Sequence, residues 1–467
     1  MKRAVIVGGG IAGLAAAYYL RALSQRKGVQ LEVVLLEKER RAGGCILTER
    51  AEGFVVEGGP DCLYAEKPWG LELCREIGLG DQLVEARPET RGTYILWDGQ
   101  LHPLPEGFFL LVPTALSPFL RSRLLSWRAK LRVALEPLVP RRKGQGDESL
   151  ASFVLRRLGR EVLEKVAEPL IAGIHAAEPE TMSLRATFPR FADLESRYGS
   201  LLLGLWKVRR KASPANRPYK VPFVSLRGGM GEMVEGILEH LPPESMRLGE
   251  EVLAVEREGG RYRVRGRGGT WEADYLILAT PSHVSSRLLQ GLDQWLSETL
   301  LMIPYSSTAT VSLAYEAQEV LPLLRGHGFV VPRREGRRLM AVTFSSRKFP
   351  SRAPEGKVLI RAFIGGAKDE GAVLLDDEEL LRLVMTELRE ILGIRSRPLH
   401  HWIFRFPASM AQYRVGHEGR VRALEERIKE HPGLFLTGGA FHGIGISDCC
   451  RQGKELAGRV LGLEKGP

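Results

Sequence analysis

The sequence predicts an α/β fold, and three observations near its start support this class. Val5 to Val7 form a short β-branched run, and glycines follow at 8, 10 and 13 with the spacing G-x-G-x-x-G. The next residues, Leu14 to Leu20, are apolar and rich in alanine, as in a buried helix. A second apolar run, Leu31 to Leu36, then ends in the acid Glu37. The order is therefore strand, tight turn, helix, strand and acid.

Each part of this unit suits the binding of a dinucleotide in a Rossmann-type domain. Gly8 permits the turn, Gly10 lets the backbone approach a pyrophosphate, and Gly13 lets helix and strand pack closely. The helix N-terminus also offers unpaired N–H groups to an anion. Glu37 can accept hydrogen bonds from ribose and would repel a 2′-phosphate, which favours FAD or NAD over NADP. The predicted contacts here are Gly8, Gly9, Gly10, Ile11, Ala12, Gly13, Glu37 and Lys38.

Length and composition are those of a globular protein of two or three domains. The chain has 467 residues, of which 44% are hydrophobic and 26% are charged. No segment approaches about 18 uninterrupted apolar residues, and Met1-Lys2-Arg3 leads straight into the first strand, so we expect a cytoplasmic protein. The five cysteines are Cys45, Cys62, Cys74, Cys449 and Cys450. We expect free thiols, although Cys449 and Cys450 leave a covalent cofactor link open.

The net charge of +11 comes largely from one segment. Residues 121–143 carry eight lysines and arginines and a single acid, interleaved with Leu124, Leu125, Trp127 and other apolar residues. A basic amphipathic stretch of this kind lies in a membrane interface, contacts an acidic partner or is a solvated face of its own domain. Because the excess is local, we expect no nucleic-acid partner.

Hydrophobic periodicity outlines the rest of the chain. A hairpin is expected around the Asp98-Gly99 turn, helices over about 104–210, an exposed linker over 210–222, and a helix that begins within 223–230 and runs to about 241. Strands are expected at 251–255, 262–264, 274–281, 308–315, 328–332, 339–344, 358–364 and 433–437, and helices at 376–392 and 448–461. No internal repeat is evident.

Three further segments carry a resemblance to a known family. Arg41-Ala42-Gly43-Gly44 has the R-x-G-G pattern of the flavoproteins that include amine oxidases, phytoene desaturases and protoporphyrinogen oxidases. Glu57-Gly58-Gly59-Pro60-Asp61 and the run Thr437 to Asp448 make the chain similar, over nearly its whole length, to the short bacterial porphyrinogen oxidases of haem synthesis. This resemblance implies FAD as the cofactor.

The resemblance also implies a division of the chain into five segments. A discontinuous Rossmann-type FAD-binding domain would comprise residues 1–92, 211–281 and 426–467. An inserted helical domain would occupy 93–210, and an antiparallel-sheet substrate domain would occupy 282–425.

The resemblance assigns further cofactor contacts. Arg41, Gly43 and Gly44 would lie over FAD, and Glu57, Gly58, Gly59, Pro60 and Asp61 would lie on the flavin ring side. Val252 and Phe406 correspond to positions that contact FAD, although relatives carry Trp at the position of Phe406. Ile444, Gly445 and Ile446 precede a helix that is expected to begin at Ser447 and Asp448, where backbone amides can face the pyrophosphate or the flavin edge.

The substrate site implied by the resemblance is an apolar cavity with a cation near its mouth. Lys67 aligns with a basic residue that anchors a propionate, and Ile174 and His175 belong to a wall segment. His175 and Phe363 stand where relatives have Tyr, and His175 can be a general base or a polar wall residue. No catalytic acid–base pair and no metal ligand is assigned.

The implied activity is a six-electron oxidation of a porphyrinogen by O2 through FAD, which yields H2O2. Coproporphyrinogen III is favoured as substrate, and protoporphyrinogen IX is also expected to react. An amine oxidase or carotenoid desaturase on the same fold is one alternative, although Cys45 stands where amine oxidases usually have Arg. A non-catalytic binding protein like the Rab escort proteins is another. Contact with the chelatase of the haem pathway, peripheral membrane contact through 105–143, and a monomeric or homodimeric state are further expectations.

Overall fold

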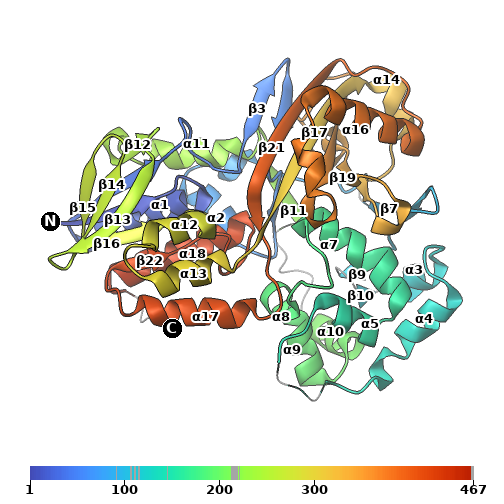
Figure 1. Cartoon of the computed structure of the whole chain (residues 1–467). Coiled ribbons are helices and arrows are strands. Elements are labelled where there is room, and N and C mark those ends of the chain that lie inside the picture. The colour runs from blue at the N-terminus through green and yellow to red at the C-terminus, as the bar shows by residue number, and fades with distance from the viewer. Residues whose placement is uncertain are drawn as a thin grey trace.

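The computed structural model describes residues 1–90, 92–105, 108–109, 112–113, 116–142, 144, 146–211, 219 and 221–463. Figure 1 shows three parts: a parallel sheet with its helices on the left, a second sheet at the upper right, and a helical part at the lower right. No helix in these ranges has the length and apolar character needed to span a bilayer.

The parallel sheet has five strands in the order β12-β2-β1-β16-β22. Their bounds are Met246–Leu248, Leu31–Glu37, Lys2–Val7, Tyr275–Leu278 and Leu434–Leu436. Side chains alternate across it, so that Ala4 and Ile6 pack with α1 (Ile11–Lys27), α11 (Gly231–Glu239) and α18 (Ile446–Val460), whereas Val5 and Val7 face the opposite side. There they meet the sheet of β13 (Val252–Glu258), β14 (Arg261–Gly266) and β15 (Thr270–Ala273) and the helices α12 (Ser282–Leu289), α13 (Gln294–Leu301) and α17 (His417–Ile428). Burial of both faces confirms the predicted Rossmann-type α/β domain.

The second sheet has seven strands in the order β21-β17-β20-β19-β18-β7-β8. Their bounds are His400–Ala411, Tyr305–Glu316, Lys357–Gly365, Leu339–Thr343, Gly328–Val330, Thr93–Trp97 and Gln100–Pro103. All neighbours are antiparallel except β7 and β18. Helix α16 (Asp377–Leu392) packs its apolar stripe on one face of this sheet. The other face carries Thr310, Ser312, Arg361, Phe363 and Phe404, and it is turned toward the rest of the molecule.

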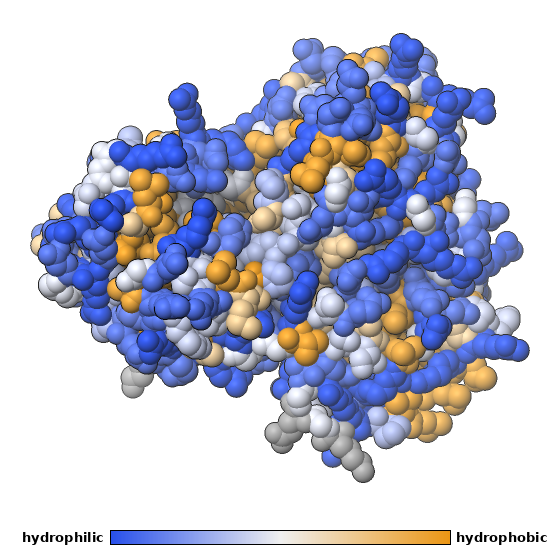
Figure 2. Space-filling model, viewed as in Figure 1, coloured by the Kyte–Doolittle hydropathy of each residue, from blue (hydrophilic) through white to orange (hydrophobic). Residues whose placement is uncertain are grey.

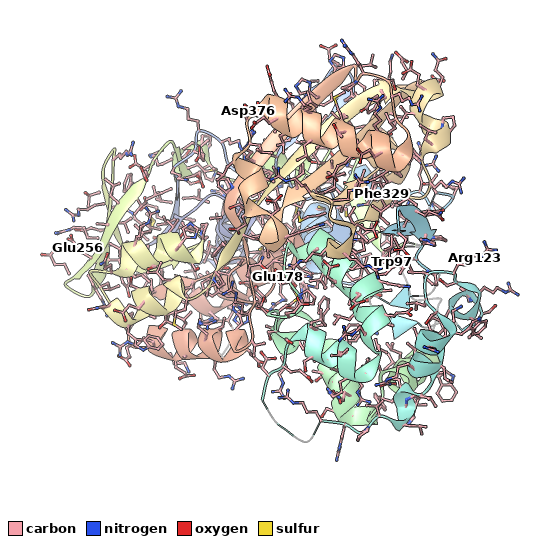
Figure 3. The ribbon with its side chains drawn as sticks, turned by 45° about the vertical axis from the view of Figure 1, so that its right-hand side comes forward. Trp97, Arg123, Glu178, Glu256, Phe329 and Asp376 are labelled. Carbon is pink, nitrogen blue, oxygen red and sulfur yellow. The ribbon has the colours of Figure 1, made fainter. Side chains whose placement is uncertain are left out.

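The helical part is built on its own hydrophobic cluster, which also includes Ile95, Val330 and Ala341 of the seven-stranded sheet. Its helices are α3 (Leu116–Arg121), α4 (Trp127–Ala134), α5 (Leu150–Arg157), α6 (Arg160–Val162), α7 (Glu168–His175), α8 (Leu184–Thr187), α9 (Pro189–Tyr198) and α10 (Leu201–Lys211), with a π-helical turn, Leu163–Ala167, before α7. Trp97 of β7, labelled in Figure 3, lies where this part meets the sheet, with Lys165 Nζ 4.7 Å from its ring centroid.

Shorter elements connect these parts. They are β3 (Thr48–Ala51), β4 (Phe54–Glu57), β5 (Leu63–Tyr64), α2 (Trp69–Glu76), β6 (Leu83–Glu85), β9 (Phe108–Phe109), β10 (Val112–Pro113), β11 (Phe223–Leu226), β13 (Val252–Glu258), β14 (Arg261–Gly266), β15 (Thr270–Ala273), α12 (Ser282–Leu289), α13 (Gln294–Leu301), α14 (Ala317–Val320), α15 (Ser345–Lys348) and α17 (His417–Ile428). Three-residue to five-residue 3₁₀ turns occur at Gly80–Gln82, Glu136–Leu138, Pro243–Ser245, Leu321–Leu323, Arg333–Glu335, Gly366–Lys368 and Glu370–Leu374.

Most expected strands and helices are confirmed, with three corrections. Residues 223–226 form strand β11, so the helix expected to begin within 223–230 begins only at Gly231, after the turn at Gly228 and Gly229. The hairpin around Asp98 exists, but it belongs to the seven-stranded sheet and not to the helical part. The last helix begins at Ile446 rather than at 448.

Most of the linker expected at 210–222 lies outside the described residues. The division into five segments stays a prediction.

Candidate active site

The glycine turn between β1 and α1 leaves space in front of the helix. Gly8 has φ +107, and a Cβ on Gly13 would lie 2.0 Å from the Gly8 carbonyl oxygen, so both positions require glycine. A Cβ on Gly10, by contrast, would meet no atom within 4 Å. Gly10 is also the N-cap of α1 and offers no side chain to its free N–H groups. Ile11 and Ala12 form the first turn behind this open position.

Glu37 is held beside the same turn. Its Oε2 accepts a hydrogen bond from the Gly9 N–H, and its Oε1 accepts one from the Glu39 N–H at 2.9 Å. Lys38 between them is exposed. The Glu37 carbonyl accepts from the Glu250 N–H at 2.8 Å, which brings the start of β13 at Val252 to this edge of the sheet. The carboxylate is therefore fixed in place at the end of β2.

The loop that contains Arg41 packs against the glycine turn. The Gly43 N–H donates to the Gly9 carbonyl at 2.8 Å, and a Cβ on Gly44 would lie 3.1 Å from the Gly10 Cα. The Arg41 guanidinium donates to the carbonyls of Gly44 at 2.6 Å and Ile46 at 3.1 Å. Arg41 thus holds the loop, and the two glycine segments lie side by side.

The C-terminal run reaches the same region through α18. This helix packs along α1, and a Cβ on Gly453 would lie 2.8 Å from the Ala16 nitrogen. Ile444 and Gly445 precede the helix, Gly445 is an N-cap without a side-chain hydrogen bond, and Ile446 opens the first turn. The buried hydroxyls of Thr437 and Ser447 have no partner among the described residues.

These features fit a bound dinucleotide. Two helix N-termini without side-chain caps supply N–H donors for a pyrophosphate, and Glu37 supplies the acceptor for ribose hydroxyls. The open position at Gly10 and the unpartnered hydroxyls of Thr437 and Ser447 leave both space and hydrogen-bonding capacity. The residues present therefore fit FAD, and Gly8 to Gly13, Glu37, Gly43, Gly44, and Ile444 to Ile446 would hold it.

The segment 58–61 is packed tightly beneath the seven-stranded sheet. A Cβ on Gly59 would lie 1.7 Å from the Cys45 carbonyl oxygen, and one on Gly58 would lie 2.9 Å from Phe404. Phe406 follows on the same face of β21 as Phe404 and is half-buried. Pro60 is exposed. Only glycine fits at 58 and 59, so this segment can approach the sheet and the Arg41 loop together.

Asp61 and Glu57 at the two ends of this segment have their own partners. Asp61 pairs with Lys348 Nζ at 2.8 Å, and although burial raises its pKa, the charges of Lys348 and Arg361 outweigh burial and hold the pKa well below its usual range. The Glu57 side chain accepts from the Thr48 hydroxyl at 2.6 Å and the Met230 N–H at 2.7 Å, while burial raises its pKa. The Glu57 carboxylate thus ties β4 to the start of α11.

The predicted substrate residues come from three separate elements. Lys67 Nζ contacts both carboxylate oxygens of Asp448 in the first turn of α18, at 2.6 and 2.9 Å, so it is an ion-paired cation. His175 ends α7, and its ring meets Phe188 edge to face at 5.6 Å. Burial, together with the nearby Lys67 charge, lowers the pKa of His175 to about 4. The Lys67 charge therefore acts on the His175 ring, and His175 is neutral at pH 7.

Ile174 and Phe363 both lie near the contact between α7 and the sheet. Ile174 is half-exposed, whereas the preceding Gly173 packs on Val330 and Ala341, at 3.2 and 3.4 Å from its would-be Cβ. Phe363 pairs with Ala341 across β19 and β20 and packs on the same cluster. The structure thus brings Phe363 next to α7.

Two charged residues at this junction were not predicted from the sequence. Arg361 and Lys348 are buried and contact the segment 58–61. Arg361 could have been found from the sequence, because it is a charged residue within the otherwise apolar strand Val358 to Ile364.

Comparison with known proteins identifies the family. The chain is 35% identical over 464 residues to coproporphyrinogen III oxidase of Bacillus subtilis (strain 168), covering 98% of both chains. It is 31% identical to coproporphyrinogen III oxidase of Staphylococcus aureus (strain NCTC 8325 / PS 47), covering 98% of this chain and 99% of the relative. A crystal structure of a provisionally assigned protoporphyrinogen oxidase from Exiguobacterium sp. 255-15 superposes with a TM-score of 0.86 at 36% identity, covering 98% of both chains.

The family model described as flavin containing amine oxidoreductase matches residues 11–461, which include helix α1 from its first residue, the segment 58–61 and the C-terminal run. The chain belongs to the flavin containing amine oxidoreductase family.

Proposed function

We propose that this protein is an FAD-dependent porphyrinogen oxidase of haem biosynthesis, with O2 as the electron acceptor and coproporphyrinogen III as the favoured substrate. The observation that carries the proposal is the full-length similarity to coproporphyrinogen III oxidases, together with a site that fits FAD. Protoporphyrinogen IX is expected to react as well, in line with the similarity to the protoporphyrinogen oxidase structure.

The overall reaction removes six electrons and six hydrogens in three two-electron steps. FAD, when bound, would supply the acceptor for a hydride from a ring carbon, and three O2 would take up the six electrons and become three H2O2. The protein's task is to hold the macrocycle against the cofactor, since orientation supplies much of the rate. We assign this task to residues 58–61, α7 and Phe363; the close packing of Gly58 and Gly59 and the packing of Phe363 on the cluster that contains α7 support the assignment.

Lys67 and His175 have different tasks in this proposal. Lys67 is a cation at the first turn of α18, where it can exchange Asp448 for a substrate carboxylate. His175 is neutral above about pH 4, so it can accept a hydrogen bond from a pyrrole N–H without adding a charge, or take up the proton and become an imidazolium. Neither residue has to act as a strong acid.

A fluorescence assay tests the proposal. Coproporphyrinogen III and protoporphyrinogen IX, prepared anaerobically, are added separately to the yellow protein in air, with FAD-free protein as the control. Porphyrin emission well above autoxidation is expected, faster with coproporphyrinogen III. No emission from a flavin-loaded sample would overturn the proposal, and H2O2 from a simple amine would favour an amine oxidase. A colourless sample that cannot be loaded with FAD would favour a binding protein.

We also propose peripheral membrane contact through the helical part. Trp127 and Leu131 on α4 and Leu138 beyond it are 72%, 61% and 77% exposed. Figure 2 shows hydrophobic atoms gathered over this lower right part, and Arg123, labelled in Figure 3, lies at its outer edge. Exposed apolar side chains beside basic ones suit an anionic bilayer surface. Contact with the haem-pathway chelatase and a monomeric or homodimeric state remain predictions.

A further inference from the structure

Arg361 is a buried cation that forms no ion pair with a carboxylate among the residues that the structure describes. It lies on β20 and is 3% exposed. Its Nη2 donates to the carbonyls of Gly58 and Gly59, and these are the hydrogen bonds that the described residues provide for the guanidinium. Nε is buried without any partner in the described part of the chain. A guanidinium carries five N–H donors, so most of its capacity is unused.

The acids nearest to Arg361 are already neutralised by other cations. Asp61 pairs with Lys348 at 2.8 Å, and Glu57 lies 3.5 Å from the Arg352 guanidinium. Arg352 is equally buried, but it also donates to the Ser225 hydroxyl at 2.7 Å and to two backbone carbonyls. Within the described residues, this cluster therefore holds one positive charge in excess, and that charge is on Arg361.

Burial of such a charge is costly unless something compensates it. Desolvation lowers the pKa of Arg361, yet an arginine remains protonated in proteins. The guanidinium lies 4.6 Å from the centroid of the Phe363 ring, which provides some electrostatic compensation but no hydrogen-bond acceptor. An additional anionic group is the natural complement to this arrangement.

The position of Arg361 indicates which ligand would carry that anionic group. Side chains two residues apart on a strand share a face, so Arg361 points to the same side as Phe363, the predicted substrate-wall residue. Ser312 pairs directly with Arg361 across β17 and β20, and its hydroxyl is buried and also without a partner among the described residues. Gly58 and Gly59, which Arg361 contacts, belong to the segment predicted at the flavin ring. Two unpartnered polar groups thus lie side by side between the predicted cofactor and substrate.

We propose that Arg361 binds an anionic oxygen of a ligand at the junction of flavin and substrate, with Ser312 as its neighbour. The inference rests on the proposed function. The anionic oxygen comes either from a carboxylate of the porphyrinogen or from the reduced flavin ring. Both would accept hydrogen bonds from the guanidinium and neutralise its charge. In the first case Arg361 is a determinant of specificity for substrates rich in carboxylates.

The test compares Arg361→Met, which removes the charge at similar length, with Arg361→Lys, which keeps it. Arg382→Gln removes an exposed arginine from α16, on the opposite face of the same sheet, and is the matched control. Each flavin-loaded protein is assayed for KM and kcat with coproporphyrinogen III and protoporphyrinogen IX, and for the midpoint potential of its flavin. The rise in melting temperature on adding coproporphyrin III, or its tetramethyl ester, is also measured.

If a substrate carboxylate is the partner, Arg361→Met raises KM by about tenfold to a hundredfold, because a hydrogen bond to a charged group is lost. The stabilisation by coproporphyrin III falls to that given by the ester, and the flavin potential stays unchanged. If the flavin is the partner, the potential falls while KM changes little. Arg361→Lys shows a smaller effect of the same kind, since it keeps the charge but not the planar fork.

Unchanged KM, potential and ligand stabilisation in a folded, flavin-loaded Arg361→Met protein would overturn the inference. If that variant does not fold, Arg361→Lys decides by the same criteria. Failure of the proposed function looks different, since the wild-type protein itself then forms no porphyrin, while potential and melting temperature still report on Arg361.

Discussion

Gly10 and Gly13 stand three residues apart in one turn, yet their surroundings differ. The would-be Cβ of Gly13 clashes with the Gly8 backbone at 2.0 Å, whereas that of Gly10 faces open space. Gly10 has φ −69, which any residue can adopt. Gly13 therefore serves the fold of the turn, and Gly10 serves whatever approaches the helix N-terminus.

This difference predicts opposite results for two alanine variants. Gly10→Ala is expected to fold with a melting temperature close to that of the FAD-free wild type, because an N-cap change costs at most about 1 kcal/mol. It should bind FAD at least about tenfold more weakly, since the methyl group occupies the approach to the pyrophosphate. Gly13→Ala should lose stability with or without FAD. Melting curves and flavin titrations measure both effects, and undiminished FAD affinity in Gly10→Ala would contradict the assignment.

The lowered pKa of the His175 ring should make the stability of the protein depend on pH. The folded protein keeps this ring neutral to about pH 4, whereas in the unfolded chain it protonates near pH 6.5. Protons therefore bind preferentially to the unfolded chain as the pH falls through this window, and the free energy of unfolding falls with it, by at most about 3 kcal/mol. Chemical unfolding at pH 7 and pH 4.5 should show a smaller loss for His175→Gln than for wild type. Equal losses would mean that the ring is not held neutral.

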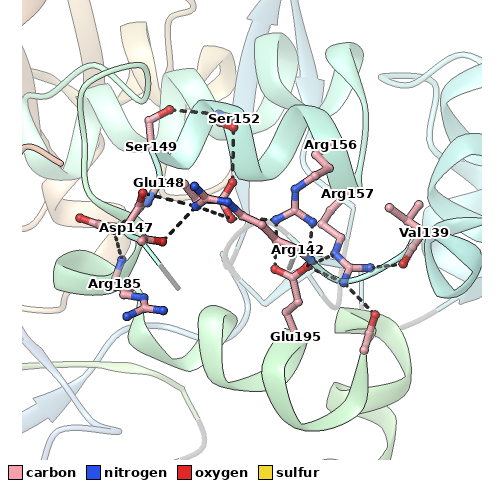
Figure 4. A network of polar contacts seen from close by, with 12 residues as sticks. Val139, Arg142, Asp147, Glu148, Ser149, Ser152, Arg156, Arg157, Arg185 and Glu195 are labelled. Atoms are coloured by element: carbon pink, nitrogen blue, oxygen red, sulfur yellow. Dashed lines mark hydrogen bonds and ion pairs between the residues drawn. The ribbon is translucent and has the colours of Figure 1, made fainter. Parts of the chain in front are cut away.

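At the scale of elements, a buried ion network joins the helices of the lower right part. Arg157 of α5 donates to Glu195 of α9 at 2.7 Å and to Glu136 at 3.1 Å (Figure 4 shows its Glu195 side). Glu136 is fully buried and also accepts from the Ser200 hydroxyl and the Leu201 N–H at the start of α10. One carboxylate thus serves as the counterion of Arg157 and as the N-terminal acceptor of a helix.

Removal of that carboxylate should be strongly destabilising. Glu136→Ala leaves Arg157 with one counterion fewer and the first N–H groups of α10 without their acceptor, for which we expect a loss of about 3–5 kcal/mol in the free energy of unfolding. Glu164→Ala is the matched control, because its pair with Arg160 is exposed and worth at most about 1 kcal/mol. Denaturant titration measures both. A loss in Glu136→Ala no larger than in the control would show that the network contributes little.

The elements predicted from the sequence are those with a strong local signal. Helix α16 has a regular apolar stripe and a capping box between Asp376 and Glu379, and its predicted range agrees with the structure within one residue. Strand β21 was not predicted, because Pro407 interrupts its apolar run. The sheet tolerates this proline because β21 is an edge strand and because Pro407 lies where its pairing with β17 shifts register. Strand β11 was taken for helix, although Gly228 and Gly229 mark the break before α11.

At the scale of the whole molecule, the cofactor side of the site follows from the topology of the parallel sheet. β1, β2 and β22 all run the same way, so the glycine turn, Glu37 and Thr437 emerge at one edge. Each of these has a local motif, which made it predictable. Arg361 reaches the site only through the register of β20 against β17 and through its packing on residues about 300 positions away in the chain. No local spacing contains that information.

The exposed apolar side chains of Trp127, Leu131 and Leu138, here called the exposed stripe, predict how the whole molecule behaves at a membrane. Wild-type protein should sediment with vesicles that contain anionic lipid more than with neutral ones, and added salt should weaken this binding because it screens the basic side chains. Trp127→Glu combined with Leu131→Glu places two negative charges on the stripe and should abolish the binding, with little effect on stability since both side chains are exposed.

Trp295→Glu is the control for this experiment, because it changes an exposed tryptophan on α13, in the part that contains the parallel sheet. It should bind vesicles as the wild type does. Equal loss of binding in the control would mean that general hydrophobicity and not the stripe is responsible. Absence of wild-type sedimentation with anionic vesicles would exclude the membrane contact, and the stripe would then be a surface for a protein partner or for a second copy of the chain.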